Sequence, residues 1–263
     1  MSHTLRSYGG FFLLAARQEL FHRGALIGRF AFYGVILLVF SRIWFVVKDA
    51  GQLPGTDARN LLWYLAVTEW IILSIPVTHT EIEQEVKTGN IAYALTRPVS
   101  FIWVKTFEGA GHLLLRMCVL AVAGLCFAYV LAGGPPSHPE GLLLAFPVGL
   151  CAGLVSLLFH NCIGLSAFWL QDANPLYWVW QKLNFILGGL ILPLSLYPEW
   201  LQKIAMLTPF SALLYGPGQI AMQADVYLAL SVTGRLLLWG GLAALLLELL
   251  YRRGCAILNV NGG

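Results

Sequence analysis

Several ionisable side chains stand within apolar stretches of this sequence, and three of them could carry ions or neutralise one another. Glu69, Arg116 and Lys182 each lie inside a run of mostly apolar residues. Glu69 is about 12 Å from either end of its run, which is too deep for its short side chain to reach bulk water. Two interpretations stay open: a structural ion pair with Arg116 or Lys182, or a carboxylate that lines a water-filled translocation path.

A second set of polar residues, His112, His160 and Asn161, would suit a metal site or an intramembrane catalytic site. No H-E-x-x-H, G-x-S-x-G or paired-carboxylate spacing accompanies them. We therefore expect these side chains to form hydrogen bonds between helices, with no metal, no cofactor and no catalytic residue. The chain also lacks a G-x-x-x-x-G-K-[ST] phosphate loop, so any ATP that drives this protein is bound by another polypeptide.

Membrane-spanning helices are the elements that must position these side chains. Of the 263 residues, 58% are hydrophobic and only 11% are charged, and the mean hydropathy is +0.73. A soluble domain would need more charge on its surface. Runs of about 20 apolar residues, long enough to cross the membrane, predict spans over 25–47, 61–77, 110–131, 142–170, 176–196 and 226–251.

The sequence thus predicts an all-α polytopic membrane protein that forms a single domain over residues 1–263. No soluble domain fits between the spans. The stretch 197–225 contains apolar runs broken by Pro and Gly, so we expect short interfacial or re-entrant helices there. The net charge of +3 implies no nucleic-acid surface, because topology explains the basic residues.

The distribution of Lys and Arg predicts that both termini are cytoplasmic. With that orientation, eight basic residues lie in inside segments and three in outside segments, as the positive-inside rule requires. The inside residues are Arg6, Arg17, Arg23, Lys87, Arg97, Lys105, Arg252 and Arg253, and the outside residues are Lys48, Arg59 and Lys203.

The charged segment "EIEQEVKTGNIAYALTRPVS", residues 81–100, interrupts the apolar sequence and has the pattern of two short helices. Glu83 and Lys87 form an i,i+4 pair in the favourable order. Gly89 is expected to end the first helix. Asn90 is expected to cap a second helix that runs through Leu95, and Pro98 to end that helix after Arg97. The alternative is an ordinary solvated loop. Ile82, Val86, Ile91 and Leu95 are the apolar residues that we expect a soluble partner to contact.

The stretch "EVKTGNIAYALTRPVSFIWVK" resembles the segment that follows the second span in type-2 ABC exporter permeases. The six-span layout, the interrupted stretch before the last span and the ending "YRRGCAILNVNGG" are also similar to single-domain bacterial members of that family. The resemblance implies a coupling helix within residues 81–98 that sits in a groove of a separate ABC ATPase subunit dimer. Its coupling residues would be Glu81, Ile82, Glu85, Val86, Gly89, Asn90, Leu95, Arg97 and Pro98.

The resemblance also implies a second permease, identical or similar to this chain, with a translocation path at the interface. An N-terminal elbow helix would occupy residues 1–24. The protein would cross the bacterial inner membrane several times and would be surrounded by its lipids. In that family the second and fifth spans face the path, so Glu69, Asn184 and Phe185 are its candidates here. The alternative is an ion-coupled secondary transporter that uses Glu69, Arg116 and Lys182, although the two halves of the sequence show no convincing repeat.

Overall fold

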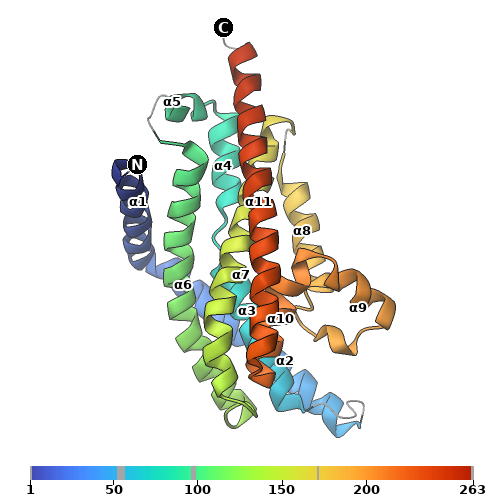
Figure 1. The fold of residues 1–263 in the computed structure, drawn as a ribbon. Coiled ribbons are helices and arrows are strands. Elements are labelled where there is room, and N and C mark those ends of the chain that lie inside the picture. Colours follow the sequence, from blue (N-terminus) through green and yellow to red (C-terminus); the bar gives the residue numbers. More distant parts are fainter. Residues whose placement is uncertain (1, 52–56, 96–98, 171, 262–263) are drawn as a thin grey trace.

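The structure, a computed structural model, describes residues 2–51, 57–95, 99–170 and 172–261, and every regular element in these ranges is helical. The helices form one elongated bundle (Figure 1). In chain order they are α1 Ser2–Phe21, α2 Arg23–Asp49, α3 Ala58–Ser74, α4 Thr78–Lys87, α5 Ile91–Leu95, α6 Phe101–Ala132, α7 Glu140–Leu165, η1 Ser166–Phe168, α8 Asn174–Leu187, η2 Leu194–Leu196, α9 Glu199–Met206, η3 Ser211–Tyr215, α10 Gly216–Gln223 and α11 Val226–Asn261.

Five helical stretches in the described residues are long and apolar enough to cross a membrane. They match five of the six expected spans, with shifted bounds: α6 begins nine residues before the expected start of its span, and α11 continues well beyond Tyr251. The chain is therefore a polytopic helical membrane protein. The five stretches are Arg23–Asp49, Ala58–Lys87, Phe101–Ala132, Glu140–Phe168 and Val226–Ile257, of which the second contains the break between α3 and α4.

The expected span over 176–196 is not one helix. α8 has 14 residues, which at 1.5 Å per residue is about 21 Å and shorter than the hydrocarbon core. It ends at Gly188 and Gly189, and Gly189 adopts a φ of +62° that glycine tolerates and other residues rarely do. The next residues form the short helices η2, α9, η3 and α10, which agrees with the short helices expected over 197–225.

Helix α3 lies at the centre of the bundle and packs against α2, α6, α7 and α10. Its aromatic and hydroxyl side chains donate hydrogen bonds to backbone carbonyls of other elements. Trp70 Nε1 donates to the Met117 carbonyl at 2.8 Å, and Thr68 Oγ1 donates to the Leu190 carbonyl at 2.7 Å. Polar groups within a membrane must find partners inside the protein, so these bonds help to fix the position of α3.

Helix α1 corresponds to the expected elbow helix and runs beside the first part of α6 in the same direction (Figure 1). The ring of Tyr8 stacks on Phe107 with centroids 5.2 Å apart, and further along both helices Glu19 pairs with Arg116. A Cβ atom at Gly111 would collide with the Phe12 carbonyl oxygen. Glycine at position 111 therefore lets α1 and α6 come into close contact.

The start of α1, the pair α4–α5 and the end of α11 lie towards the same end of the bundle, whereas the turn between α6 and α7 lies at the other end (Figure 1). At the first of these ends α4 packs closely on α7. A Cβ atom added at Gly164 would lie 2.8 Å from Ile82 Cβ and 2.9 Å from the His79 carbonyl oxygen. These are shorter than ordinary contacts, so only glycine fits there without displacing α4.

This contact gives a first prediction. Gly164→Ala should lower the free energy of unfolding by about 1–3 kcal/mol, because the added methyl group meets the backbone of α4. Gly241→Ala is the matched control, since nothing lies within 4 Å of its Cβ position in α11. Thermal unfolding of the purified variants in detergent measures the difference. Equal stability of the two variants would show that α4 and α7 are not closely packed.

Candidate functional site

Helices α4 and α5 with the turn at Gly89 form the expected helix–turn–helix in place of a plain loop. The ion pair between Glu83 and Lys87 is present, and Gly89 has a φ of +72°. α4 begins at Thr78, three residues before the expected start. The expected roles of Arg97 and Pro98, and the side chain of Leu95, lie outside the described residues.

The apolar face of this unit is directed into the protein. Ile82 and Ile91 have no exposed surface and form a cluster with residues of α6, α7 and α11. The expectation that Ile82 and Ile91 contact a soluble partner is therefore wrong, because the protein's own spans cover them. Val86 is only partly buried beside the same cluster. The other members of the cluster are Phe101, Ile102, Cys162, Leu165 and Leu247.

Polar contacts hold α4 to the spans as well. Thr78 Oγ1 donates to Asn161 Oδ1 of α7 at 2.6 Å, and Asn161 Nδ2 donates to Thr106 Oγ1 of α6 at 2.9 Å. The buried carboxylate of Glu83 accepts a hydrogen bond from the Ala173 N–H, just before α8, at 3.3 Å. α4 is thus bound directly to α7 and to the residue before α8, and through Asn161 to α6. Asn161 has the helix-bridging role expected from the sequence.

Two buried histidines link α4 to α7 and α8. The ring of His79 stacks on Tyr177 at 3.8 Å between centroids, and His160 lies edge-on to the same tyrosine at 5.3 Å. The Nδ1 atoms of both histidines are buried without a hydrogen-bond partner. In the described part of the chain, no three His, Cys, Asp or Glu side chains gather as a metal site would require.

The opposite face of α4 is open to solvent and forms a polar groove of about 460 Å³. We call this groove the coupling surface, because it contains residues of the segment for which the family resemblance implies contact with an ATPase. Its two glutamates lie on α4, and Lys105 of α6 lies 3.6 Å from the Glu81 carboxylate. A partner that docks here meets hydrogen-bonding groups and negative charge. The residues of the coupling surface are Thr80, Glu81, Gln84, Glu85, Thr88, Asn90 and Lys105.

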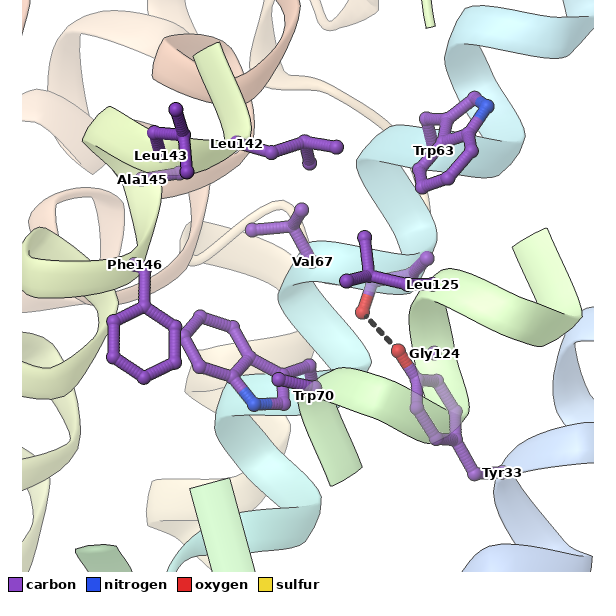
Figure 2. A pocket seen from close by; sticks show the side chains of 12 residues that line it. Tyr33, Trp63, Val67, Trp70, Gly124, Leu125, Leu142, Leu143, Ala145 and Phe146 are labelled. Atoms are coloured by element: carbon purple, nitrogen blue, oxygen red, sulfur yellow. Dashed lines mark hydrogen bonds between the residues drawn. The ribbon is translucent and has the colours of Figure 1, made fainter. Parts of the chain in front are cut away.

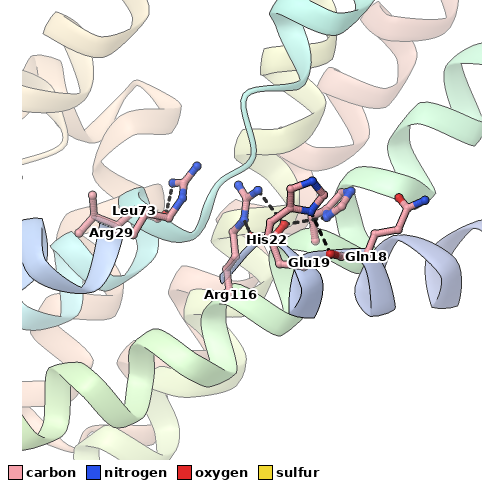
Figure 3. Close-up of polar contacts among 7 residues, drawn as sticks. Gln18, Glu19, His22, Arg29, Leu73 and Arg116 are labelled. Carbon is pink, nitrogen blue, oxygen red and sulfur yellow. Dashed lines mark hydrogen bonds and ion pairs between the residues drawn. The ribbon is translucent and has the colours of Figure 1, made fainter. Parts of the chain in front are cut away.

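A second hollow, the polar cavity, has a volume of about 570 Å³ and is lined by residues of α1, α2, α4 and α6. Figure 3 shows charged side chains that line it, Glu19, Arg29 and Arg116. Arg116 binds Glu19 through two hydrogen bonds, from Nε at 2.6 Å and from Nη2 at 2.8 Å. The ring of His112 bonds the same carboxylate at 2.8 Å. Arg116, one of the two candidate partners of Glu69, is therefore paired with Glu19 instead.

The environment of Glu19 keeps its carboxyl ionised. Burial by itself would raise the pKa, but the hydrogen bonds and charges of His112 and Arg116 outweigh burial and lower the pKa to about 2 from 4.5. The folded-state pKa is thus below that of the unfolded chain. The carboxylate therefore stabilises the fold above about pH 4.5, and its contribution is lost as the pH falls from 4.5 through 2.

The three expected path residues do not form a common polar site in the described residues. Glu69 is 5% exposed on the central helix α3. Lys182, its other expected partner, lies over the rings of Trp178 and Phe185 at 5.8 Å and 5.7 Å. Asn184 is buried and donates to the Trp180 carbonyl one turn earlier at 3.0 Å. Neither expected ion pair of Glu69 is formed.

An apolar cavity of about 180 Å³ lies between α2, α3, α6 and α7. Figure 2 shows Trp63, Trp70 and Phe146 around it, with the Tyr33 hydroxyl bonded to the Ala66 carbonyl at 2.6 Å. The sequence reasoning did not find this cavity. Its only signal is the spacing of the two tryptophans, seven residues apart and hence on one helical face. The cavity can accept a small apolar group and offers little hydrogen bonding.

Comparison with known proteins gives one family. A family model described as "ABC-2 family transporter protein" matches residues 30–262, which is most of the chain. No curated protein matches the sequence. The matched region contains the coupling surface and the helices that hold α4, whereas α1 and Glu19 precede it.

The Glu19–Arg116 pair gives a second prediction. Glu19→Gln should lower the free energy of unfolding at neutral pH by about 3–5 kcal/mol, because the Arg116 guanidinium then stays buried without a counter-charge. The loss should shrink as the pH falls from 4.5 towards 2, where the wild-type carboxyl itself becomes protonated. Thermal unfolding across this pH range is the measurement, with the exposed carboxyl variant Glu140→Gln as the control.

A double-mutant cycle completes this test. Arg116→Gln alone should also destabilise the protein, and the double variant should be more stable than the sum of the two single losses predicts. Additive losses at neutral pH would mean that Glu19 and Arg116 do not interact energetically.

Proposed function

The chain belongs to the ABC-2 family of transporter proteins, and from this membership we propose that it is the permease subunit of an exporter driven by a separate ABC ATPase subunit dimer. The observation that carries the proposal is the arrangement of α4. Its inner face is buried on the spans, and its outer face forms the open coupling surface. A soluble subunit that pushes on this surface would displace membrane helices directly.

The contacts of α4 define which helices would respond. Thr78, His79 and Glu83 bind α7 or the beginning of α8, and the close contact at Gly164 prevents α4 from sliding along α7 without a clash. We infer that α4, α7 and the start of α8 move as one body when ATP binds to the partner. Helix α3 is joined to α4 by the chain segment around Pro76.

We further propose six membrane crossings with both termini in the cytoplasm of a bacterial cell. α8, together with the turn and short helices after it, would make the fifth crossing. The basic residues Lys87, Lys105 and Arg252 lie in or near the elements at the end of the bundle that carries α4, whereas Lys48 lies at the end of α2. This asymmetry supports placing the α4 end in the cytoplasm of the inner membrane.

A second permease, identical or similar, would pack against this one, with the translocation path between the two copies and lipid around them. The large apolar side chains exposed along α2 and α11, such as Val35 and Leu237, suit lipid or a second copy. We retain Glu69, Asn184 and Phe185 as proposed path residues. An ion-coupled transporter is less well supported, because Arg116 binds Glu19 and Lys182 stacks on aromatic rings.

Topology gives a third prediction. A fluorescent protein fused after Arg253 should fluoresce, because this position is expected in the cytoplasm. Alkaline phosphatase inserted between Gly133 and Glu140 should be active, because this position is expected outside. Positive charge at the α4 end of the bundle is the physical reason. Alkaline phosphatase and a fluorescent protein as paired reporters measure both positions. An external signal after Arg253 would exclude the proposed orientation.

The coupling surface gives a fourth prediction. Glu85→Lys reverses a charge in the groove and should reduce both co-purification of the ATPase and the rate of ATP hydrolysis. Gly89→Val should do the same by straining the turn, since a β-branched residue strongly disfavours a φ of +72°. Both variants should still insert and dimerise, because Glu85 and Gly89 lie beyond α3, the apolar part of the stretch Ala58–Lys87.

Glu140→Lys is the matched control, because it makes the same charge change at an exposed position of the opposite end of the bundle. It should leave ATPase binding unchanged. If Glu85→Lys and Gly89→Val bind the ATPase as well as this control does, the coupling surface is not the docking site.

A further inference from the structure

Arg29 is a charged side chain that the proposed transport cycle does not use. It lies six residues after the start of α2, which is about 9 Å along a helix that is otherwise apolar at this level. Its Nη1 donates to the Leu73 carbonyl at 2.8 Å. Among the described residues, no carboxylate forms an ion pair with Arg29. A guanidinium at such a position normally needs an anion.

The charges of the polar cavity are divided between its two ends. Lys105 lies between Glu81 at 3.6 Å and Glu108 at 3.5 Å. At the other end Glu19 already receives two hydrogen bonds from Arg116. The formal charges that line the two ends of the cavity sum to zero. Every carboxylate faces Lys105 or Arg116, however, so the end with Arg29 keeps one net positive charge.

Arg29, Arg116, His22 and Gln18 all line the cavity, and Figure 3 shows their side chains. His22 uses Nδ1 in a 2.9 Å hydrogen bond with the Gln18 carbonyl, which leaves Nε2 for another partner. Guanidinium groups bind phosphate oxygens with two parallel hydrogen bonds. A phosphate group next to Arg29 would therefore satisfy both the free charge and the remaining donors.

Exposed apolar side chains on α1 and α2, two of the helices that line the cavity, indicate the source of that phosphate. Leu14 lines the cavity, and the large apolar side chains of Leu13, Phe21 and Ile27 on α1 and α2 are 58%, 83% and 66% exposed. Such side chains at the junction of two helices offer a place for acyl chains. A free anion would gain no binding energy from this apolar surface, whereas a lipid would.

We propose that the polar cavity binds the phosphate headgroup of an anionic phospholipid, held by Arg29, with its acyl chains against the exposed apolar side chains of α1 and α2. Residues of α4 also line this cavity. A bound lipid would therefore join the N-terminal helix to the helix that carries the coupling surface. This inference concerns the chain alone and does not depend on its ATPase partner.

The test is lipid binding by the purified, delipidated full-length chain in detergent. Phosphatidylglycerol is the probe, and a galactosyl diacylglycerol with the same acyl chains, which has no phosphate, is its lipid control. Native mass spectrometry counts the bound lipid, and thermal unfolding reports whether it stabilises the protein. Arg42→Gln, an exposed arginine change in the same helix, is the matched control for Arg29→Gln.

We expect wild type and Arg42→Gln to bind phosphatidylglycerol and to be stabilised by it. Arg29→Gln should bind about tenfold more weakly or worse, and Arg29→Lys should be intermediate, because it keeps the charge without the paired donors. Equal thermal stability of the variants without lipid would show that Arg29→Gln still folds. If that variant unfolds, the Arg29→Lys affinity and the two-lipid comparison on wild type decide the question.

Two results would overturn the proposal. The first is equal binding of the two lipids by wild type, or equal phosphatidylglycerol binding by wild type and Arg29→Gln. The second is full stabilisation by soluble glycerol phosphate, which would identify a small-anion site.

Discussion

The close contact between α4 and α7 is the constraint on which the rest of this structure depends. Gly164 lets the backbone of α4 approach α7 until no side chain fits between them. That approach buries Ile82 and Ile91 and brings Thr78 within hydrogen-bonding distance of Asn161. The apolar face of α4 therefore belongs to the membrane domain, and only its polar face remains for a partner. Any force on that face reaches the spans without an intervening flexible segment.

Polar groups inside the bundle are used to fix helices rather than to form one ionic relay. Glu19 and Arg116 join α1 to α6, while Trp70 and Thr68 join α3 to its neighbours. Each such bond matters because a buried polar group that loses its partner destabilises the fold. Arg29 departs from this pattern, and the lipid proposed for the polar cavity would remove the exception.

Local rules were enough to predict the features that depend on neighbouring residues. The turn at Gly89, the Glu83–Lys87 pair and the short helices after residue 196 all follow from spacing and turn chemistry. Features set by distant contacts could not be predicted. The partner of Arg116 is 97 positions away in a helix that had no assigned packing face. The sequence predicts a continuous span through Gly188 and Gly189, whereas α8 ends just before them. The positive φ of Gly189 could not be predicted, because composition alone does not reveal it.

The most direct test of this account is a distance measurement within the permease–ATPase complex. Spin labels at Gln84 on α4 and Leu154 on α7, in a chain whose five cysteines have been replaced, report whether the two helices move together. Both positions have exposed side chains. ATP binding should leave the distance within one copy unchanged and alter the Gln84-to-Gln84 distance between the two copies. A change in the Gln84–Leu154 distance on ATP binding would contradict the claim that α4 and α7 form one body.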